Sequence, residues 1–381
     1  MIKNQNLVLT KSNQNIMSES IDFSITDETF SKILESKKQL GLNDQSWDDW
    51  FNLILKNLKP KKQTDYLEKV ANNFYEESFD NWVKNFAINL PYIWNDFSAR
   101  ELTPSDSKGP NSAIVVGRGP SLKKFQHLKL LAQSNFDGAI ICSDGILIDA
   151  LKSGITPEKF PNFYVVTIDP VEKIKHYYDD EIIKKYGSKI NGIFSTFSHP
   201  EVVENARKNN VKIHWLHTLF DYSENKKSFN RVAGLMVRAK NHKNGLPGIQ
   251  TGGNVGTAAW FVGWQILKCE NICLIGINHG WEEDDPWELI VSHGFDAKHQ
   301  NIEKNSELAQ KLFPKIFNPD FETYCIMDPI FQYYRRALIE FISRTPDWVR
   351  TINSTQGGSI FGEKIQSMKF IDFLKNSSLS Q

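Results

Sequence analysis

Apolar runs and amphipathic stretches alternate along the chain from residue 113 onward. Seven short runs rich in Val, Ile and Phe predict buried strands, at residues 113–116, 139–142, 163–168, 192–194, 211–215, 272–277 and 348–352. Apolar residues at helical spacing fill most of the gaps, at residues 122–134, 146–153, 200–209, 254–268 and 329–344. This alternation predicts an α/β fold in which helices cover both faces of a mostly parallel sheet.

The N-terminal part of the chain follows a different pattern. Residues 1–25 are rich in Asn, Ser and Lys and predict a mobile terminus. Within residues 26–98, apolar residues recur at steps of three and four, which predicts a helical N-terminal region. Its aromatic positions, Trp82 and Phe86 among them, favour a core or a surface packed on the next domain over a ligand site. Residues 99–112 predict a linker, and residues 363–381 a C-terminal helix and tail.

Two segments, at residues 223–246 and 278–324, carry no clear strand signal. Long connections of this kind are candidate lids or insertions over a site. The first segment holds four cations that could reach an anionic ligand, although a solvated basic loop is the favoured interpretation: Arg231, Arg238, Lys240 and Lys243.

Composition narrows the function classes. The chain has 45 Lys plus Arg and 45 Asp plus Glu, a balance that argues against general binding to nucleic acids or membrane surfaces. The four cysteines form no C-x-x-C motif, which fits buried free thiols in a reducing cytoplasm. The N-terminus lacks the apolar segment of a signal peptide, and the most apolar helix, at residues 255–267, is too short to span a bilayer. We therefore expect a cytoplasmic protein with small-molecule partners, and the oligomeric state stays open, a homo-oligomer included.

The first predicted strand runs directly into Gly117-Arg118-Gly119-Pro120-Ser121. Glycines allow a sharp turn and a close approach of ligand to backbone, and Ser121 is placed to cap the helix that follows. Free N–H groups and the helix dipole at such a corner attract anions, and the Arg118 guanidinium suits a phosphate. We expect Gly117, Arg118, Gly119 and Ser121 to bind a nucleotide phosphate; the alternative is an ordinary strand–turn–helix corner.

Several familiar motifs are missing from the sequence. Leu122 stands where the dinucleotide fingerprint has its third glycine, and no P-loop sequence occurs. No G-x-S-x-G elbow appears either, so a hydrolase triad has no support.

Small polar residues also follow other predicted strands. Because ligands of open parallel sheets bind beyond the carboxyl ends of the strands, these residues are candidates for one shared site. Turn formation alone is the alternative explanation for them. The further candidates for nucleotide binding are Gly252, Gly253, Asn254, Asn278, Thr355 and Gln356.

Asp144 and Asp169 follow the second and third predicted strands and are the best metal ligands. Oxygen ligands at neighbouring strand ends suit a Mg²⁺ ion that also touches substrate phosphates, and we expect both residues to be catalytic. In the alternative, Asp144 belongs only to a turn and Asp169 caps a helix before Pro170. The acidic run at residues 282–285 is more typical of a solvated loop than of a cation site.

Four histidines in predicted loops are candidate acids or bases. They are His199, His217, His279 and His293. His279, beside Asn278 at a strand end, is the one we expect to be catalytic.

Four stretches together resemble one known family: residues 115–122 (VVGRGPSL), 143–170 (SDGILIDALKSGITPEKFPNFYVVTIDP), 252–278 (GGNVGTAAWFVGWQILKCENICLIGIN) and 352–362 (INSTQGGSIFG). They are similar to the MptE-like family, which groups archaeal 6-hydroxymethyl-7,8-dihydropterin pyrophosphokinases with motility accessory factors associated with flagellin glycosylation. The resemblance implies a Rossmann-like nucleotide-binding domain over residues 113–362. It also implies that ATP and Mg²⁺ are used to pass a diphosphate to the pterin hydroxymethyl oxygen, with release of AMP.

The sequence departs from the pyrophosphokinases after the third strand. The pyrophosphokinases look to have a pair of acidic residues there, in a sequence of the T-D-L-D-G type. This chain has Thr167-Ile168-Asp169-Pro170 at the same place, with one carboxylate. This stretch and the NSTQGGSIFG tail look more like the motility accessory factors, which are similar to sialyltransferases and would use a CMP-activated nonulosonic sugar, a His acid or base and no required metal. The pyrophosphokinase-like reaction is the favoured prediction, with that glycosyltransferase and a non-catalytic nucleotide-binding module as alternatives.

Overall fold

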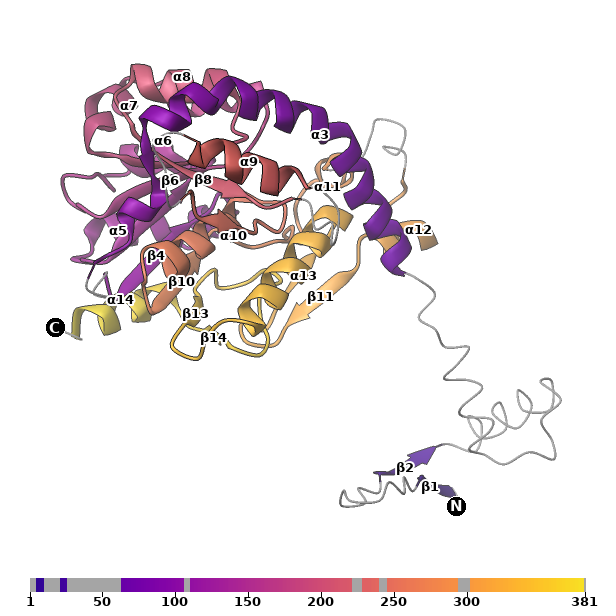
Figure 1. Cartoon of the computed structure of the whole chain (residues 1–381). Coiled ribbons are helices and arrows are strands. Elements are labelled where there is room, and N and C mark those ends of the chain that lie inside the picture. Colours follow the sequence, from indigo (N-terminus) through magenta and orange to yellow (C-terminus); the bar gives the residue numbers. More distant parts are fainter. Residues whose placement is uncertain are drawn as a thin grey trace, which may run out of the picture. The chain divides into compact units, whose positions relative to one another are not determined.

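The computed structural model describes residues 5–9, 21–25, 63–105, 110–220, 228–239, 245–293 and 302–379 (Figure 1). The chain divides into two compact units, Met1–Glu68 and Lys69–Gln381, and each is considered by itself. In the first unit, β1 (Gln5–Leu9) pairs antiparallel with β2 (Ile21–Ile25), in a stretch for which the sequence predicted no element. The predicted helical residues 26–62 lie outside the described residues.

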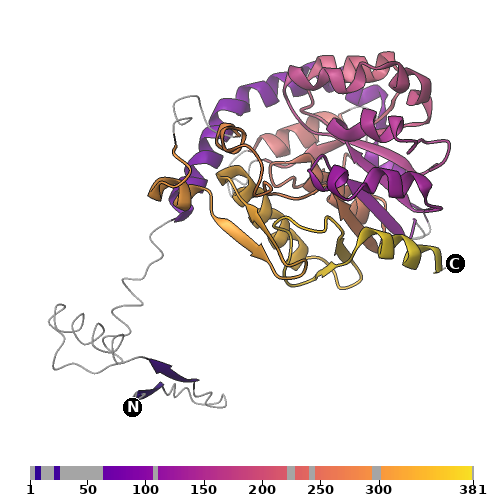
Figure 2. The same cartoon turned by 180° about the vertical axis from the view of Figure 1, so that it is seen from behind.

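The second unit is built on a parallel sheet of ten strands (Figures 1 and 2). From one edge the order is β14 (Ile365–Ser367), β13 (Arg350–Asn353), β10 (Asn271–Ile275), β4 (Ser112–Val116), β5 (Ala139–Ser143), β6 (Phe163–Thr167), β7 (Asn191–Ser195) and β8 (Lys212–Thr218). The short strands β3 (Phe97–Ser98) and β9 (Gly248–Ile249) both pair with β8. All seven predicted runs form strands of this sheet.

Successive strand residues point to opposite faces of the sheet, and helices cover each face. In β4, Ile114 and Val116 belong to one hydrophobic cluster, while Ala113 and Val115 belong to another. The first cluster includes residues of α5 (His127–Gln133), α6 (Leu147–Lys152), α7 (Glu181–Tyr186), α8 (Pro200–Lys208) and α14 (Phe370–Leu379). The second includes residues of α10 (Val255–Phe261), its π-helical continuation Val262–Ile266, and α13 (Pro329–Ser343). The predicted α/β fold is therefore confirmed.

The long helix α3 (Gln63–Asn95) packs on the sheet through its C-terminal half. Phe86, Leu90 and Ile93 are buried in the first cluster, and Trp82 lies against it. The aromatic stripe therefore packs on the sheet, as the sequence indicated. The boundary between the two units falls between Glu68 and Lys69, inside the stretch that the sequence assigned to a separate helical region.

The predicted linker at residues 99–112 begins with ordered structure. Ser98 accepts a hydrogen bond from the Arg100 N–H, and the Glu101 side chain accepts one from the Ser98 N–H, which forms a capping box for a 3₁₀ turn at Ala99–Leu102. Ala99 is fully buried. This turn joins α3 and β3 directly to the sheet unit.

The two segments without strand signals contain helices and a small hairpin. Helix α9 (Phe229–Arg238) lies in the first segment. The second contains α11 (Trp287–Ser292), α12 (Glu307–Leu312) and β11 (Lys315–Asn318), which pairs with β12 (Thr323–Ile326) around a cluster of its own. The predicted helix at 122–134 is broken at Gln126, whose φ is 52°, into α4 (Ser121–Lys124) and α5. Of the helices that the structure describes, none is both long and apolar enough to cross a lipid bilayer.

Asn89→Ala is expected to lower the free energy of unfolding by about 1–3 kcal/mol. The buried Asn89 amide donates to the carbonyl oxygens of Thr196 (3.3 Å) and Ser198 (2.8 Å), so the variant leaves both acceptors short of a donor. Urea unfolding measures the change. Ile88→Ala, at an exposed neighbouring position of α3, is the matched control. Equal stability of the two variants would contradict this account of how α3 is held.

Candidate functional site

The strand order reverses between β4 and β10. From β4 the chain adds β5, β6, β7 and β8 on one side, then returns to place β10 on the other side of β4. Past the strand ends, the Gly117 N–H donates to the Ile275 carbonyl at 2.8 Å and the Gly119 N–H to the Gly276 carbonyl at 2.7 Å. In open α/β sheets, the crevice outside the carboxyl ends of the strands at such a reversal is where ligands bind.

The glycines of the predicted phosphate motif allow the close contact between the segments that follow β4 and β10. A Cβ atom on Gly117 would lie 2.3 Å from the Gly276 carbonyl oxygen, and one on Gly119 would lie 2.2 Å from Asn278 Oδ1. The sequence predicted that glycines let a ligand approach the backbone and that N–H groups here are free. That part of the prediction is wrong for Gly117 and Gly119, because protein atoms make the close approach and accept both N–H groups.

Ser121 has a different role from the predicted helix cap. Pro120 occupies the cap position of α4, and no side chain makes a capping bond there, so the capping prediction is wrong. The fully buried Ser121 hydroxyl donates instead to Asn278 Oδ1 at 2.8 Å. This bond fixes the orientation of the Asn278 amide, whose Nδ2 is buried without a hydrogen-bond partner.

Arg118 points toward the segment after β6. Its Nη1 donates to Tyr177 Oη at 2.9 Å, and the guanidinium carbon lies 5.6 Å from the centre of the Tyr177 ring. Tyr177 belongs to a 3₁₀ helix at Glu172–Tyr178, where the sequence predicted no element. The sequence therefore found the arginine but not the aromatic residue that orients it.

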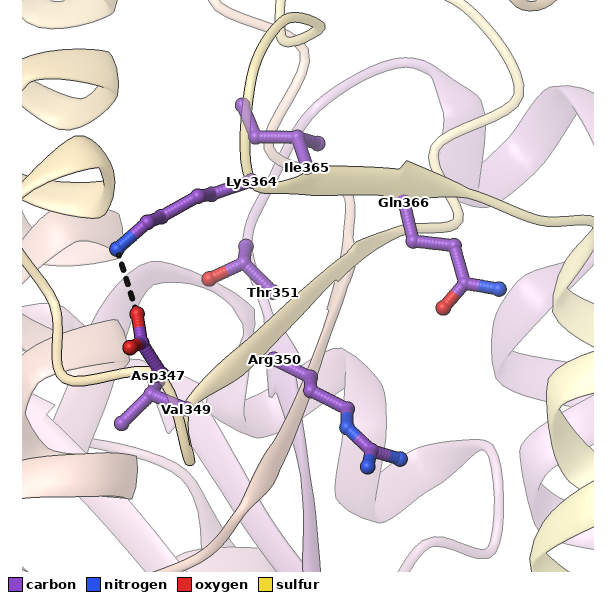
Figure 3. A pocket seen from close by; sticks show the side chains of 7 residues that line it. All are labelled: Asp347, Val349, Arg350, Thr351, Lys364, Ile365 and Gln366. Atoms are coloured by element: carbon purple, nitrogen blue, oxygen red, sulfur yellow. Dashed lines mark hydrogen bonds and ion pairs between the residues drawn. The ribbon is translucent and has the colours of Figure 1, made fainter.

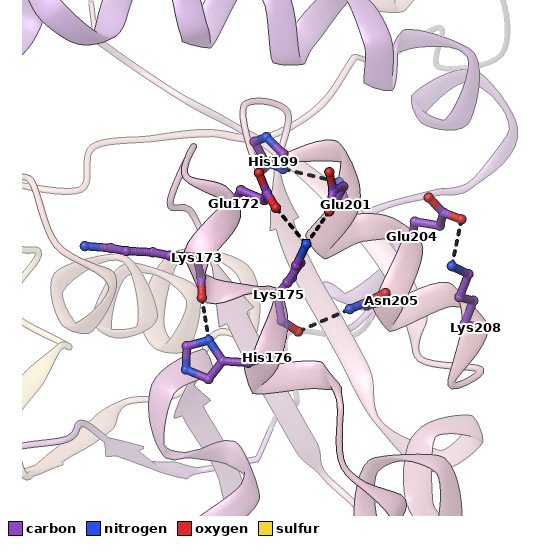
Figure 4. A network of polar contacts seen from close by, with 9 residues as sticks. All are labelled: Glu172, Lys173, Lys175, His176, His199, Glu201, Glu204, Asn205 and Lys208. Carbon is purple, nitrogen blue, oxygen red and sulfur yellow. Dashed lines mark hydrogen bonds and ion pairs between the residues drawn. The ribbon is translucent and has the colours of Figure 1, made fainter.

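This 3₁₀ helix is held against α8 by a polar network (Figure 4). Lys175 Nζ bridges Glu172 at 2.6 Å and Glu201 at 2.7 Å, and Asn205 donates to the Lys175 carbonyl. Lys173 extends away from the network in Figure 4, and its charge is close enough to Asp169 to oppose the rise in pKa that burial causes at that carboxyl. The network thus fixes the segment that brings Tyr177 and Lys173 to the crevice.

Asp144, at the end of β5, has a buried carboxyl group with one unused oxygen. Its Oδ1 accepts the Gly145 N–H at 2.7 Å, and the nearby Thr167 hydroxyl lies 2.6 Å from Tyr178 Oη. Oδ2 is buried without a hydrogen-bond partner. Burial, together with the nearby Asp169 charge, raises the pKa of Asp144 to about 8.

Asp169, at the end of β6, is exposed at the mouth of the same crevice. The surrounding protein still raises the pKa of its carboxyl, and the Lys173 charge opposes that shift. Asp169 does not cap the following 3₁₀ helix, whose cap position is Val171 and which lacks a side-chain cap. Asp144 and Asp169 are therefore close enough to interact, as parallel strand ends require.

His279 shares the crevice edge with Asn278. It is buried, its Nδ1 has no hydrogen-bond partner, and its backbone has a φ of 41°. Burial and the nearby Arg335 charge lower the pKa of His279 to about 3. The imidazole is thus neutral at pH 7 and takes up a proton only in strong acid, which suits a hydrogen-bonding group better than the expected catalytic acid or base.

The other three histidine candidates each have hydrogen-bond partners of their own. His199 caps α8 through its ring nitrogen, which accepts the Glu201 N–H at 3.4 Å. His217 hydrogen-bonds to Thr196 and Asn230, at 2.9 and 3.0 Å. His293 contacts Asp328 near the start of α13.

The second glycine-rich turn packs against α13. Gly252 and Gly253 have φ values of 55° and 83°, and a Cβ on Gly253 would lie 2.8 Å from Tyr334 Cε1. Asn254 caps α10 by accepting the Thr257 N–H at 2.9 Å. Tyr334 itself lies near Asp169, whose charge contributes to raising the pKa of that tyrosine. The turn therefore forms the α13 side of the crevice.

Thr355 and Gln356, after β13, are used inside the fold. The buried Thr355 hydroxyl hydrogen-bonds to Asn353 Oδ1 and to the Gly357 carbonyl, both at 2.7 Å. The Gln356 side-chain oxygen accepts the Phe370 N–H at 3.2 Å and so holds the start of α14. The structure does not bring these two residues together with Asp144.

The acidic run at 282–285 forms surface contacts, as expected for a solvated loop. Glu282 pairs with Lys124 at 2.6 Å and Glu283 with Lys315 at 2.5 Å. Within the described residues, no group of three or more His, Cys, Asp or Glu side chains is arranged to hold a metal ion. Any ion between Asp144 and Asp169 would need further ligands from water or substrate, which is how Mg²⁺ is usually bound.

A separate hollow of about 360 Å³ lies at the other end of the sheet (Figure 3). It is lined by the first residues of β13 and β14 and by the Lys364–Asp347 ion pair of 3.3 Å. Because it adjoins the amino ends of these strands, it is not part of the crevice.

Comparison with known proteins identifies the family. A family model described as 6-hydroxymethylpterin diphosphokinase MptE-like matches residues 84–284, more than half of the chain. The chain belongs to the MptE-like family. A diphosphokinase is a transferase, so membership supports a transferase activity, and the resemblance seen in the sequence is confirmed. The match begins within α3 and ends after β10, so it includes the strand ends of β4, β5, β6 and β10 but not α13.

Among solved structures, the MptE-like chain is similar to the MAf glycosyltransferase from Magnetospirillum magneticum AMB-1, with a TM-score of 0.52 and 13% identity. The match covers 78% of this chain and 41% of that one, so the chain spans less than half of that protein. At this identity the similarity shows the shared fold. No curated protein matched the chain.

Asp144→Asn is expected to stabilise the ligand-free protein above about pH 5. The folded state keeps the Asp144 proton up to a pKa of about 8, whereas an unfolded aspartate loses it near a pKa of about 3.9. Between these values the folded state binds more protons, so the wild-type free energy of unfolding falls as the pH rises. Asn keeps an oxygen for the Gly145 N–H and removes the titration, so its stability advantage over the wild type grows as the pH rises from about 4 toward 8.

Urea unfolding at acidic and mildly alkaline pH measures this difference. Asp149→Asn, on the exposed side of α6, is the matched control and should leave the pH dependence unchanged. The same pH dependence in wild type and Asp144→Asn would contradict a raised pKa at Asp144.

Proposed function

We propose that the chain is a nucleotide-dependent transferase that passes a diphosphate from ATP to a hydroxymethyl group of a pterin-like acceptor, with Mg²⁺ as the metal. The observation that carries the proposal is the buried, unpartnered Oδ2 of Asp144 beside Asp169 at the reversal of strand order. A buried carboxylate oxygen without a partner is costly, and a cation bound with the substrate would remove that cost.

The residues present fit a Mg²⁺ ion in their chemistry. Asp144 Oδ2 and the exposed Asp169 carboxylate are hard oxygen ligands on adjacent strands, and Mg²⁺ is typically held by one or two carboxylates plus phosphates and water. When bound, the ion would neutralise charge on the phosphates. Because a nearby positive charge favours the ionised form of a carboxyl group, Mg²⁺ binding would lower the raised pKa of Asp144 and release a proton.

Side-chain cations supply the positive charge for a polyphosphate. Arg118 is positioned by Tyr177, and Lys173 lies near Asp169 on the same side of the crevice. The Gly117 and Gly119 N–H groups are already bonded within the protein, so the guanidinium, not these backbone groups, is the expected phosphate donor. Asn278 Nδ2 is a further unpartnered donor at the same strand ends.

A glycosyltransferase using a CMP-activated nonulosonic sugar is the second candidate. It is favoured by the single carboxylate in Thr167-Ile168-Asp169-Pro170, which gives one ligand fewer than an acidic pair would supply. The similar fold of the MAf glycosyltransferase supports glycosyl transfer as a candidate reaction. A non-catalytic nucleotide-binding module is the remaining alternative.

A thermal-shift series with ATP, AMP, CTP and CMP, each with and without Mg²⁺, separates these candidates. A ligand of the folded state raises the melting temperature with the logarithm of its saturation. Stabilisation by ATP that requires Mg²⁺, together with AMP release when 6-hydroxymethyl-dihydropterin is added, supports the diphosphate transfer. Stabilisation by CMP or CTP that is indifferent to Mg²⁺ favours the glycosyltransferase, and no shift with any nucleotide contradicts a preformed nucleotide site.

Arg118→Ala is expected to weaken binding of Mg²⁺–ATP by about 1–3 kcal/mol, because a charge-assisted contact with phosphate is lost. Titration calorimetry measures the dissociation constant. Tyr177→Phe is the matched control, since it removes the partner of Arg118 Nη1 and keeps the guanidinium. Unchanged ATP affinity in Arg118→Ala would contradict the placement of the phosphates.

A further inference from the structure

His293 is hydrogen-bonded to the buried carboxylate of Asp328 beside the crevice. His293 Nδ1 lies 2.6 Å from Asp328 Oδ2, so in the neutral imidazole Nδ1 carries the proton and donates it. The His293 side chain is 37% exposed, whereas the Asp328 side chain is fully buried. Within the described residues, Nε2 has no hydrogen-bond partner, and in this tautomer it carries the free lone pair.

The hydrogen bonds around Asp328 hold its carboxyl group in one orientation. Oδ2 also accepts the Trp281 indole N–H at 2.6 Å, and Oδ1 accepts the Phe331 N–H at 2.8 Å. Asp328 thereby caps α13, a helix of 15 residues whose dipole favours a negative charge at this end. The Phe331 N–H and the Trp281 indole N–H already give each carboxylate oxygen a donor. The hydrogen bond to the half-exposed His293 is therefore not needed to satisfy the buried carboxylate.

The pair lies next to the proposed reaction site. The His293 ring is 4.8 Å from the Phe331 ring, centre to centre, and Phe331 in turn stacks on His279 at 6.2 Å. Tyr334, one turn further along α13, is influenced by the charges of both Asp169 and Asp328. Tyr334 therefore lies near both the crevice carboxylate and the carboxylate of the His–Asp pair.

We propose that His293, oriented by Asp328, is the general base that activates the acceptor hydroxyl, an inference that rests on the proposed function. Nε2 takes the proton of the acceptor hydroxyl as its oxygen forms a bond to the β-phosphorus of the nucleoside triphosphate. The bond from that phosphorus to the α,β-bridging oxygen breaks, and the nucleoside monophosphate leaves with the electron pair. Asp328 stabilises the imidazolium, which then returns the proton to water.

Charged groups on the neighbouring elements are engaged in other contacts. Glu282 next to Trp281 pairs with Lys124, and Asp285 accepts the Glu282 N–H at 2.8 Å. Arg335 of α13 donates to the Ser359 carbonyl at 2.7 Å. Asp328 is accordingly the charged partner that faces His293 in the described residues.

The test is diphosphate transfer from Mg²⁺–ATP to 6-hydroxymethyl-dihydropterin by the full chain, followed as AMP release across pH. His293→Gln is expected to lower kcat by at least about 100-fold and to abolish the acidic limb of the kcat profile, with unchanged ATP affinity. Imidazole added to His293→Ala should restore part of kcat.

Asp328→Asn keeps a residue that caps helices well, so its expected loss of kcat reports on the orientation of His293.

Trp281→Phe is the matched control, because it removes the other donor to the same Asp328 oxygen and keeps an aromatic ring beside His293, and it should retain most of kcat. An active wild type with full activity and an unchanged pH profile in His293→Gln would overturn the base while leaving the proposed function in place. A wild type that binds ATP but transfers no diphosphate would overturn the proposed function, and this role of His293 with it. If neither His293 variant folds, an Asp328→Asn variant with a wild-type pH profile would overturn the inference.

Discussion

The contact between the carboxyl ends of β4 and β10 is the constraint on which the site depends. It requires a glycine after each of the two strands. A Cβ on Gly117 would lie 2.3 Å from the Gly276 carbonyl oxygen, and a Cβ on Gly276 would lie 2.8 Å from the Gly117 carbonyl oxygen. The approach brings Asn278 and His279 to the same crevice as Arg118, although about 160 residues separate them along the chain. Any side chain at these glycines would push the two strand ends apart and disrupt the Ser121–Asn278 bond.

The distribution of charge around this contact separates the site from the rest of the surface. The described residues hold many exposed ion pairs, yet neither Asp144 nor Asp169 is in an ion pair. Arg118 is directed to a tyrosine hydroxyl instead of to either carboxylate. Exposed pairs contribute little to stability, whereas an unpaired buried carboxyl group lowers it. The unpaired arrangement at the crevice is thus unfavourable for folding alone, and this is the physical argument for a bound cation and polyanion.

The fold was predictable because strand and helix periodicities are local properties of the sequence. Seven apolar runs gave seven strands, and the placement of Asp144 and Asp169 together followed from their positions at adjacent strand ends. Which N–H groups are already used was not predictable, since that depends on the pairing of β4 with β10. The partners Tyr177, Tyr178 and Tyr334 lie in elements whose tertiary placement leaves no signature in the sequence. The bond from Thr167 to Tyr178 could have been anticipated in part from the polar residue that ends β6.

Helix α13 connects features that lie far apart in the sequence. Its first turn is capped by Asp328, its Tyr334 packs against Gly253, and its Arg335 holds the loop after β13 through the Ser359 carbonyl. The cap residue itself is bonded to Trp281 and His293, which belong to the segment inserted after β10. A displacement of that segment would therefore move the start of α13 and, through Tyr334, the α13 side of the crevice. This mechanical link explains how an insertion without strand signals can take part in forming a site at the centre of the sheet.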